Sequence, residues 1–318
     1  MSSSTPVHAT EIHAYGESAL AQAADLIRAG ETVAVPTETV YGLAADATNA
    51  AAVARIYAAK GRPSFNPLIV HVADMEMARG LVAFSPVAER LAAAFWPGAL
   101  TMVLPHVEGS PVAELTSAGL PTLAVRFPSH PVMRALIRAA GVPLAAPSAN
   151  RSGHISPTRA GHVLSSLDGQ IPFILDAGAT LDGVESTIVR PEADRIVLLR
   201  PGPVTAAAIE QATGLPVIDP VSSEGITAPG QLESHYAPSK SVTLNCGVAE
   251  AGAFHIGFGP GASQRNLSAS GDLIEAAANL FAALHEADES DATRITVAPI
   301  PMDGIGVAIN DRLRRAAA

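Results

Sequence analysis

Short apolar runs bounded by proline, glycine or serine recur along this chain of 318 residues, and segments with helical spacing separate them. Runs of about four to eight apolar residues are typical of buried strands. Strands that alternate with helices indicate an α/β protein. Because the alternation keeps no strict strand–helix–strand rhythm, we predict a twisted, mixed sheet with helices packed on it.

Helices are predicted where apolar residues recur three or four positions apart between a capping residue and a stop signal. One spans residues 17–29 and ends at Gly30, and Asn49 caps a second that Gly61 ends. Ser85 and Pro86 open a third. Further helices are predicted at 131–140 and 159–167, and strands at 32–35, 67–72, 100–104, 123–127, 144–146, 173–175, 187–189 and 196–199.

Residues 216–240 are rich in proline, serine and glycine and show no hydrophobic period, which predicts a linker. Beyond it, strands are predicted at 242–244, 254–258 and 295–297 and helices at 271–287 and 306–317. We therefore expect a large domain of residues 1–215, a linker of residues 216–240, and a small α/β domain of residues 241–318.

Charge and cysteine content exclude several classes of protein. The formal net charge of −10 argues against a large nucleic-acid-binding surface, although it leaves room for a local basic pocket. The single cysteine, Cys246, excludes an internal disulfide and a cysteine-rich metal site. No signal-peptide core and no apolar run of about 18 residues is evident, so we expect a cytoplasmic protein without a membrane span.

Hydroxyl side chains follow the strand at 32–35, which ends at a proline. The stretch PTETVYGLAADA is expected to expose Thr37, Glu38 and Thr39 beside a glycine-containing turn. Such hydroxyls suit a small polar ligand, but the stretch taken alone favours a turn with capping threonines.

Lysine is rare in this chain, which has only Lys60 and Lys240. Lys60 and Arg62 flank Gly61 at a predicted helix end, and His71 follows within a dozen residues. A guanidinium and an ammonium so placed suit a polyphosphate. The alternative is helix capping, because cations are favoured at a helix C-terminus.

A polar loop, AAPSANRSGHISPT, follows the predicted strand at 144–146. Its side chains Ser148, Asn150 and Ser156 and its free backbone N–H groups could cradle an anion, or could simply form a polar surface loop. The chain contains neither a Walker A motif nor a nucleophile elbow.

Two arginines end predicted strands, Arg126 in LAVRFPSHP and Arg200 in LLRPGPV, and Ser186 begins another strand. Charged side chains at strand ends line crevices of α/β sheets. Neither a zinc-protease motif nor a compact set of metal ligands is evident. An enzyme of this kind would work by positioning and charge, as nucleotidyl-transferring enzymes do.

In order along the chain, PTETVYGLAADA, KGRPSFNPLIVHV, WPGALTMVL, LAVRFPSHP, PLAAPSANRSG and GVESTIV resemble the YrdC-type L-threonylcarbamoyladenylate synthases. The later LLRPGPV, HYAP and GIGVAINDRLRRA resemble the long form of that family. The resemblance implies a catalytic YrdC-like domain, a linker that closes over the active site, and a small Rossmann-like domain.

This resemblance implies that L-threonine, bicarbonate or CO2, and ATP yield threonylcarbamoyl-AMP and pyrophosphate. The product would pass to a tRNA threonylcarbamoyl transferase complex, with at most a weak tRNA contact by this chain. Mg2+ would arrive with ATP and keep much of its water, so no dedicated protein ligands are expected.

The resemblance also implies roles for individual residues. ATP phosphates would be held by Lys60, Arg62, Ser148 and Asn150, which form the catalytic signature. Other nucleotide contacts would come from Thr122, Ser156, Arg200 and Tyr236. Threonine would be surrounded by Thr37, His71, Arg126, Ala146 and Ser186, with Arg126 paired to its carboxylate.

Two alternatives remain open. One is a different ATP-dependent carbamoyl or acyl adenylation, as in the related domain of hydrogenase-maturation carbamoyltransferases, whose acylphosphatase and zinc-finger modules have no counterpart here. The other is an RNA-binding module, against which the net charge of −10 and the lack of an aromatic stacking platform argue.

Overall fold

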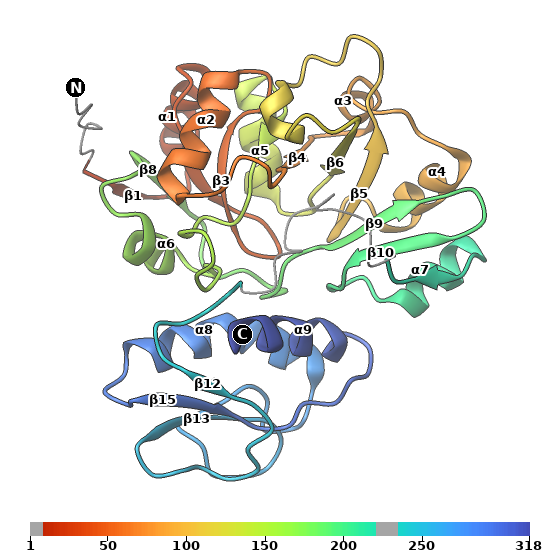
Figure 1. Ribbon diagram of the computed structural model, residues 1–318. Coiled ribbons are helices and arrows are strands. Elements are labelled where there is room, and N and C mark those ends of the chain that lie inside the picture. Colours follow the sequence, from red (N-terminus) through yellow and green to blue (C-terminus); the bar gives the residue numbers. More distant parts are fainter. Residues whose placement is uncertain (1–8, 221–234) are drawn as a thin grey trace.

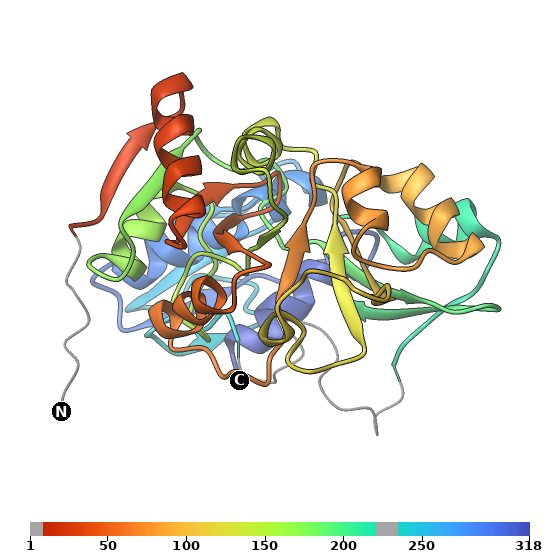
Figure 2. The ribbon, with the colours of Figure 1, turned by 90° about the horizontal axis from the view of Figure 1, so that it is seen from above.

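The computed structural model describes residues 9–220 and 235–318, so the middle of the predicted linker, residues 221–234, lies outside the described part. The described chain forms two α/β units, one large and one small (Figure 1). Seen from above, the large unit overlies the small one (Figure 2). In the described ranges, no helix has both the length and the apolar content needed to cross a membrane.

The large unit is built on a sheet of 11 strands in the order β1-β8-β2-β3-β7-β4-β6-β5-β9-β10-β11. The sheet contains parallel pairs such as β4/β6 and β5/β9 and antiparallel pairs such as β2/β3 and β5/β6, which confirms the predicted mixed sheet. The strands are β1 (Glu11–Ala14), β2 (Val33–Pro36), β3 (Tyr41–Asp46), β4 (Ile69–His71), β5 (Leu100–Pro105), β6 (Thr122–Arg126), β7 (Leu144–Ala145), β8 (Phe173–Asp176), β9 (Thr187–Pro191), β10 (Ile196–Arg200) and β11 (Val217–Ile218).

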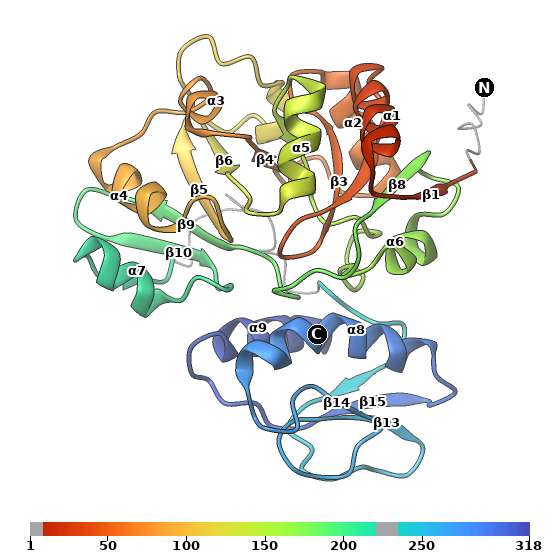
Figure 3. The ribbon, with the colours of Figure 1, turned by 180° about the vertical axis from the view of Figure 1, so that it is seen from behind.

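Helices cover both faces of this sheet. Successive side chains of a strand point to opposite faces, so buried side chains along the strands require cover on both. α1 (Glu17–Arg28) and α5 (Pro131–Ala140) pack on one face, over β8, β2, β3 and β7. The opposite face carries α2 (Ala50–Lys60), α3 (Met75–Arg79), α4 (Pro86–Phe95), α6 (Ala160–Leu167) and α7 (Ala206–Thr213), while a 3-10 turn, η1 (Glu114–Ser117), lies before β6. Figure 3 shows α1 and α5 from their own side.

Most predicted elements of the large unit are confirmed, because strong local signals mark their ends. Asn49 caps α2 by accepting from the backbone of residues 51 and 52, and Gly61 ends the helix in the left-handed conformation, with φ +59°. β1, β3, α3, α7 and β11 were not predicted. Val217–Ile218 pairs with β10, so the large sheet continues into the stretch predicted as linker.

The small unit contains a parallel sheet of four strands in the order β12-β15-β13-β14. Its helices α8 and α9 lie between this sheet and the large unit (Figure 3). The elements are β12 (Val242–Thr243), β13 (Ala253–Gly257), β14 (Arg265–Asn266), α8 (Leu273–Glu289), β15 (Arg294–Val297) and α9 (Gly306–Ala316).

The two units share one apolar cluster. Val40, Ile155 and Val184 of the large unit are buried together with Phe281 and other side chains of α8 and α9. Gly183 makes this contact possible: its φ is +72°, and a Cβ at this position would lie 2.3 Å from the carbonyl oxygen of Ala277. The backbone of the large unit therefore rests directly on α8.

Candidate active site

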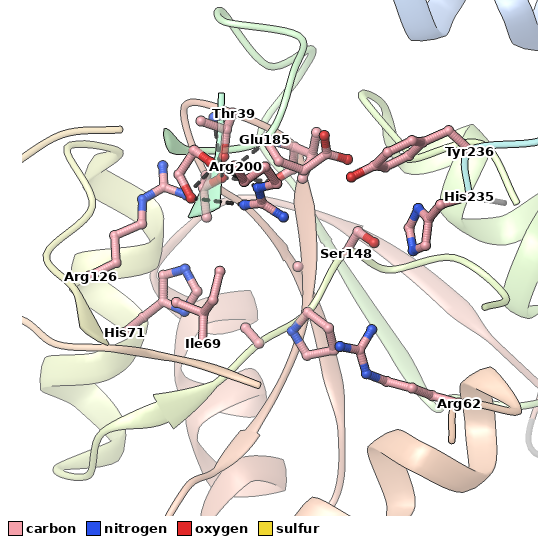
Figure 4. A pocket seen from close by; sticks show the side chains of 16 residues that line it. Thr39, Arg62, Ile69, His71, Arg126, Ser148, Glu185, Arg200, His235 and Tyr236 are labelled. Atoms are coloured by element: carbon pink, nitrogen blue, oxygen red, sulfur yellow. Dashed lines mark hydrogen bonds between the residues drawn. The ribbon is translucent and has the colours of Figure 1, made fainter. Parts of the chain in front are cut away.

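A cavity opens on the large sheet where it meets the small unit (Figure 4). The cavity lies on the sheet face that α1 and α5 cover in part, beside the ends of several strands. Its walls come from the turn after β2, from β4 and β6, from the loop after β7, and from the segments around β9 and β10.

All five residues predicted to surround threonine line this cavity, namely Thr37, His71, Arg126, Ala146 and Ser186. The topology brings them together, because β4 and β6 are parallel neighbours and His71 is directly paired with Arg126. Ser186 lies just before β9, and its hydroxyl is 2.8 Å from that of Thr101 on β5.

Arg126 is held from three directions and is only 3% exposed. Its Nη1 donates to Thr39 Oγ1 at 2.9 Å and its Nε donates to Gly98 O at 3.2 Å. Its Nη2 lies 2.8 Å from Glu38 Oε1. The guanidinium is therefore fixed in orientation before any ligand binds, which lowers the entropic cost of binding.

Glu38 balances the charge of Arg126 and also holds the backbone that leads into α5. Its carboxylate accepts from the backbone N–H groups of Ser129 at 3.1 Å and His130 at 3.3 Å, at the N-terminus of that helix. Burial alone would raise the pKa of Glu38, but the charge of Arg126 and these hydrogen bonds outweigh it and lower the pKa to about 2.

The lowered pKa of Glu38 predicts that acid decreases the free energy of unfolding over a specific pH range. Because its pKa is lower in the folded protein than in the unfolded chain, its stabilisation is complete above about pH 4.5 and is lost as the pH falls towards 2. The contribution is about 3 kcal/mol. Urea unfolding of the native protein and of Glu38→Gln should therefore differ most near pH 5 and converge near pH 2; an unchanging difference would contradict this role.

The prediction that Thr37, Glu38 and Thr39 are exposed is wrong, since all three are buried. Side-chain hydrogen bonds close the turn: Thr37 Oγ1 donates to Val40 O at 2.7 Å and lies 2.8 Å from Thr39 Oγ1. Thr37 thus closes its turn, as the capping interpretation expects, and also lines the cavity. Its role in holding a ligand stays a prediction.

Lys60 does not line the cavity. It is 3% exposed, and its Nζ donates to Ser148 O at 2.5 Å and to Asn150 O. The helix end itself is closed by Gly61, whose N–H donates to carbonyls of α2. The ammonium therefore joins the end of α2 to the loop after β7. Burial, and then the charge of Arg62, place the pKa of Lys60 well below its ordinary value.

The other members of the predicted phosphate set divide between the cavity and the loop behind it. Arg62 and Ser148 line the cavity. Arg62 Nη2 is held by Asn66 Oδ1 at 2.6 Å and Pro67 O at 2.9 Å. Asn150 does not line the cavity: its side-chain amide donates to Arg151 O and His154 O, which fixes the shape of the loop.

Of the remaining predicted nucleotide contacts, some line the cavity and others do not. Arg200 and Tyr236 line the cavity, with Arg200 held by the backbone and hydroxyl oxygens of Ser186. Ser156 is fully buried and donates to Glu185 Oε1 at 2.5 Å. Thr122 lies at the opposite end of β6 from Arg126, about 13 Å away along the strand but on the same face.

The cavity is electropositive and contains two buried neutral histidines, His71 and His235. Arg62, Arg126 and Arg200 bring three guanidinium groups to its walls, and among the described lining residues Glu185 brings the single carboxylate. Burial, and then the charge of Arg126, lower the pKa of His71 to about 3, so its imidazole is uncharged. A lining of this kind favours ligands that carry carboxylate or phosphate groups.

A sequence profile described as "Telomere recombination" matches residues 25–202, and one described as "Threonylcarbamoyl-AMP synthase, C-terminal domain" matches residues 204–318. Threonylcarbamoyl-AMP synthase of Bacillus subtilis (strain 168) is 42% identical, over 94% of this chain and 92% of its own. The chain belongs to the threonylcarbamoyl-AMP synthase family. The protein of that name from Pyrococcus abyssi is 41% identical over 92% of either chain. The predicted resemblance is thereby confirmed.

Solved structures agree with this assignment. The crystal structure of P. abyssi Sua5 complexed with L-threonine superposes with a TM-score of 0.86 at 38% identity, over 97% of this chain and 96% of that chain. E. coli YciO superposes with a TM-score of 0.55 at 22% identity over 61% of this chain, which shows a shared fold alone.

Several residues of the site were not singled out from the sequence. Glu185 lies inside a quoted family motif, and His235 precedes the predicted Tyr236. Arg312 contacts Glu185 from α9 of the small unit. These residues lie in the sequence motifs already quoted, but only the folded structure shows that they gather at one cavity.

Proposed function

We propose that this chain condenses L-threonine, bicarbonate or CO2, and ATP into L-threonylcarbamoyl-AMP, with release of pyrophosphate. The proposal is carried by a single observation: one cavity is lined both by the five residues expected around threonine and by Arg62, Ser148, Arg200 and Tyr236, which are expected around the nucleotide. Two substrates bound in one such cavity can react without leaving it.

Threonine would bind with its carboxylate on Arg126, whose guanidinium Glu38 and Thr39 already orient. The hydroxyls of Thr37 and Ser186 line the same cavity and can hold the polar groups of the amino acid, while Ala146 offers an apolar wall to its methyl group. The neutral His71 adds no positive charge that would repel the ammonium group.

The reaction would proceed in two steps. The uncharged threonine nitrogen attacks the carbon of CO2 and forms an N–C bond, and a proton of the nitrogen passes to water. If bicarbonate is used instead, its C–OH bond breaks, and the hydroxide leaves with that proton as one molecule of water. A carbamate oxygen then attacks the α-phosphorus of ATP, and the bond to the bridging oxygen of the β-phosphate breaks. Pyrophosphate leaves, and no covalent intermediate with the protein forms.

The protein would favour the second step through fixed positive charge. Arg62 lines the cavity, so it can contact phosphate oxygens directly. Lys60 would act from behind the loop: it holds the carbonyls of Ser148 and Asn150, and its charge would act on the same phosphates through that loop. Such preorganised charge stabilises a departing anion without further rearrangement.

Mg2+ would enter on the phosphate oxygens of ATP, where it neutralises the charge that develops on pyrophosphate. Within residues 9–220 and 235–318, no group of three His, Cys, Asp or Glu side chains could hold a metal ion. Both oxygens of Glu185 are engaged, by Ser156 and Arg312. The residues present thus fit an ion that is held mainly by the nucleotide and by water.

Further partners are proposed from the family. The labile product would pass to a tRNA threonylcarbamoyl transferase complex in the cytoplasm. Any direct tRNA contact of this chain, with its net charge of −10, would be weak and sensitive to salt.

The proposal is tested by pyrophosphate release from ATP in the presence of bicarbonate and each amino acid in turn. Release should require an amino acid and be greatest with L-threonine. Equal release with serine or without any amino acid would contradict the proposed specificity, and would favour a different carbamoyl adenylation.

A further inference from the structure

An arginine of the small unit reaches the wall of the cavity. Arg312, on α9, is 0% exposed. Its Nε donates to Glu185 Oε2 at 2.8 Å, and its Nη2 lies 3.4 Å from the backbone oxygen of Glu185. Since Glu185 lines the cavity, Arg312 connects the small unit to one wall of the site.

Arg312 is held in place by groups on its own side of the interface. Its Nη1 donates to Asp311 Oδ2 at 2.7 Å, and Arg315 Nε donates to the other oxygen of the same carboxylate at 3.1 Å. Its guanidinium carbon lies 5.3 Å from the ring centroid of Tyr236, within cation–π range.

The segment at Glu185 and Ser186 is fixed from both sides. Arg312 approaches the carbonyl of Glu185, and Arg200 Nε donates to the carbonyl of Ser186 at 3.0 Å. Gly202 packs against this backbone so closely that an added Cβ would lie 2.7 Å from Glu185 O. If this segment moved, the hydroxyl of Ser186 and the guanidinium of Arg200 would therefore leave their positions in the cavity.

Charge explains why Arg312 matters for this segment. Burial by itself raises the pKa of Glu185, but the charges of Arg312 and Arg200 and the hydrogen bond from Ser156 together lower it. The other ionisable groups that act on this carboxylate or its partner are His235, Tyr236 and Asp311. Without Arg312, a buried carboxylate would lose its closest counter-charge.

We propose that Arg312 is a positioning residue for the cavity, and that through Glu185 it makes threonine binding depend on the docked small unit. The inference rests on the proposed function, because it concerns the residues expected to hold threonine. Arg312 does not line the cavity itself, so any effect of its substitution on threonine must be transmitted through Glu185 and its neighbours.

The test is calorimetric titration of L-threonine into the full chain between about pH 5.5 and pH 8. Arg312→Met should bind threonine about tenfold more weakly or worse at the acidic end and recover as the pH rises, because Glu185 then ionises again. Arg312→Lys retains the positive charge, so its affinity should follow the pH profile of the native protein even if it is weaker throughout.

Arg294→Met is the matched control, since it breaks an ion pair of the same unit with Glu250 in which both side chains are 44% exposed. It should bind threonine like the native protein. If Arg312→Met does not fold, Glu185→Gln tests the same link and should bind threonine weakly with no pH dependence beyond that of the native protein.

Native affinity with a native pH profile in Arg312→Met would overturn the positioning role, and so would native affinity in Glu185→Gln if that variant is needed. A different result would contradict the proposed function, namely that the native protein releases no pyrophosphate in the presence of threonine.

Discussion

Replacing Lys60 by alanine should reduce turnover about 100- to 1,000-fold, the usual cost of losing a fixed positive or hydrogen-bonding group at a reacting oxyanion. Two losses combine in this variant. The charge near the phosphates disappears, and the carbonyls of Ser148 and Asn150 lose their shared donor. Turnover is measured as threonine-dependent pyrophosphate release at saturating ATP.

The chain supplies its own control in its second lysine. Lys240 Nζ also donates to backbone carbonyls, those of Ala287 and Ser290, but it lies in the small unit away from the cavity. Lys240→Ala should therefore lose some stability and keep its turnover. Near-normal turnover in Lys60→Ala, or equal losses in both variants, would show that Lys60 has no special role at the phosphates.

Replacing Arg126 by glutamine should raise the KM for L-threonine about 100-fold, because two charge-assisted hydrogen bonds to the carboxylate are lost. The KM for ATP should change much less, since the nucleotide is expected on the opposite side of the cavity, near Arg62 (Figure 4). Steady-state kinetics with each substrate varied in turn separates the two effects.

Arg126→Gln also leaves the buried Glu38 without its partner, so Arg126→Lys is needed beside it. Lysine keeps the charge that Glu38 needs but cannot form the two-pronged pair. This variant should fold normally and still bind threonine weakly. Arg79→Gln, which removes an exposed pair with Glu89, is the control for loss of an arginine. An unchanged threonine KM in Arg126→Lys would contradict the assigned contact.

Local signals in the sequence were sufficient for much of the fold. α5 has the predicted bounds, because Pro131 starts it and Gly141 ends it in the left-handed conformation, with φ +76°. β3 was missed because Tyr41–Asp46 is buried on both faces and contains Gly42, so the alternation that marks a half-buried strand is absent.

The site was predictable only in part, because position along the chain does not fix side-chain direction. The family resemblance grouped Lys60 with Ser148 and Asn150 as phosphate contacts, and the structure joins them by hydrogen bonds although 88 and 90 positions separate them. The resemblance did not indicate that the ammonium would bind backbone carbonyls. Arg312 could not be found from spacing at all, since its partner Glu185 lies 127 positions away in the other unit.

The formation of threonylcarbamoyl-AMP from bound threonine, bicarbonate or CO2, and ATP is tested most directly by the fate of labelled bicarbonate. The protein is incubated with ATP, Mg2+, L-threonine and 14C-bicarbonate, and the nucleotides are separated at once. We predict a labile adenylate that carries the label, forms only with threonine, and appears in step with pyrophosphate. AMP and pyrophosphate without any labelled adenylate would contradict the account.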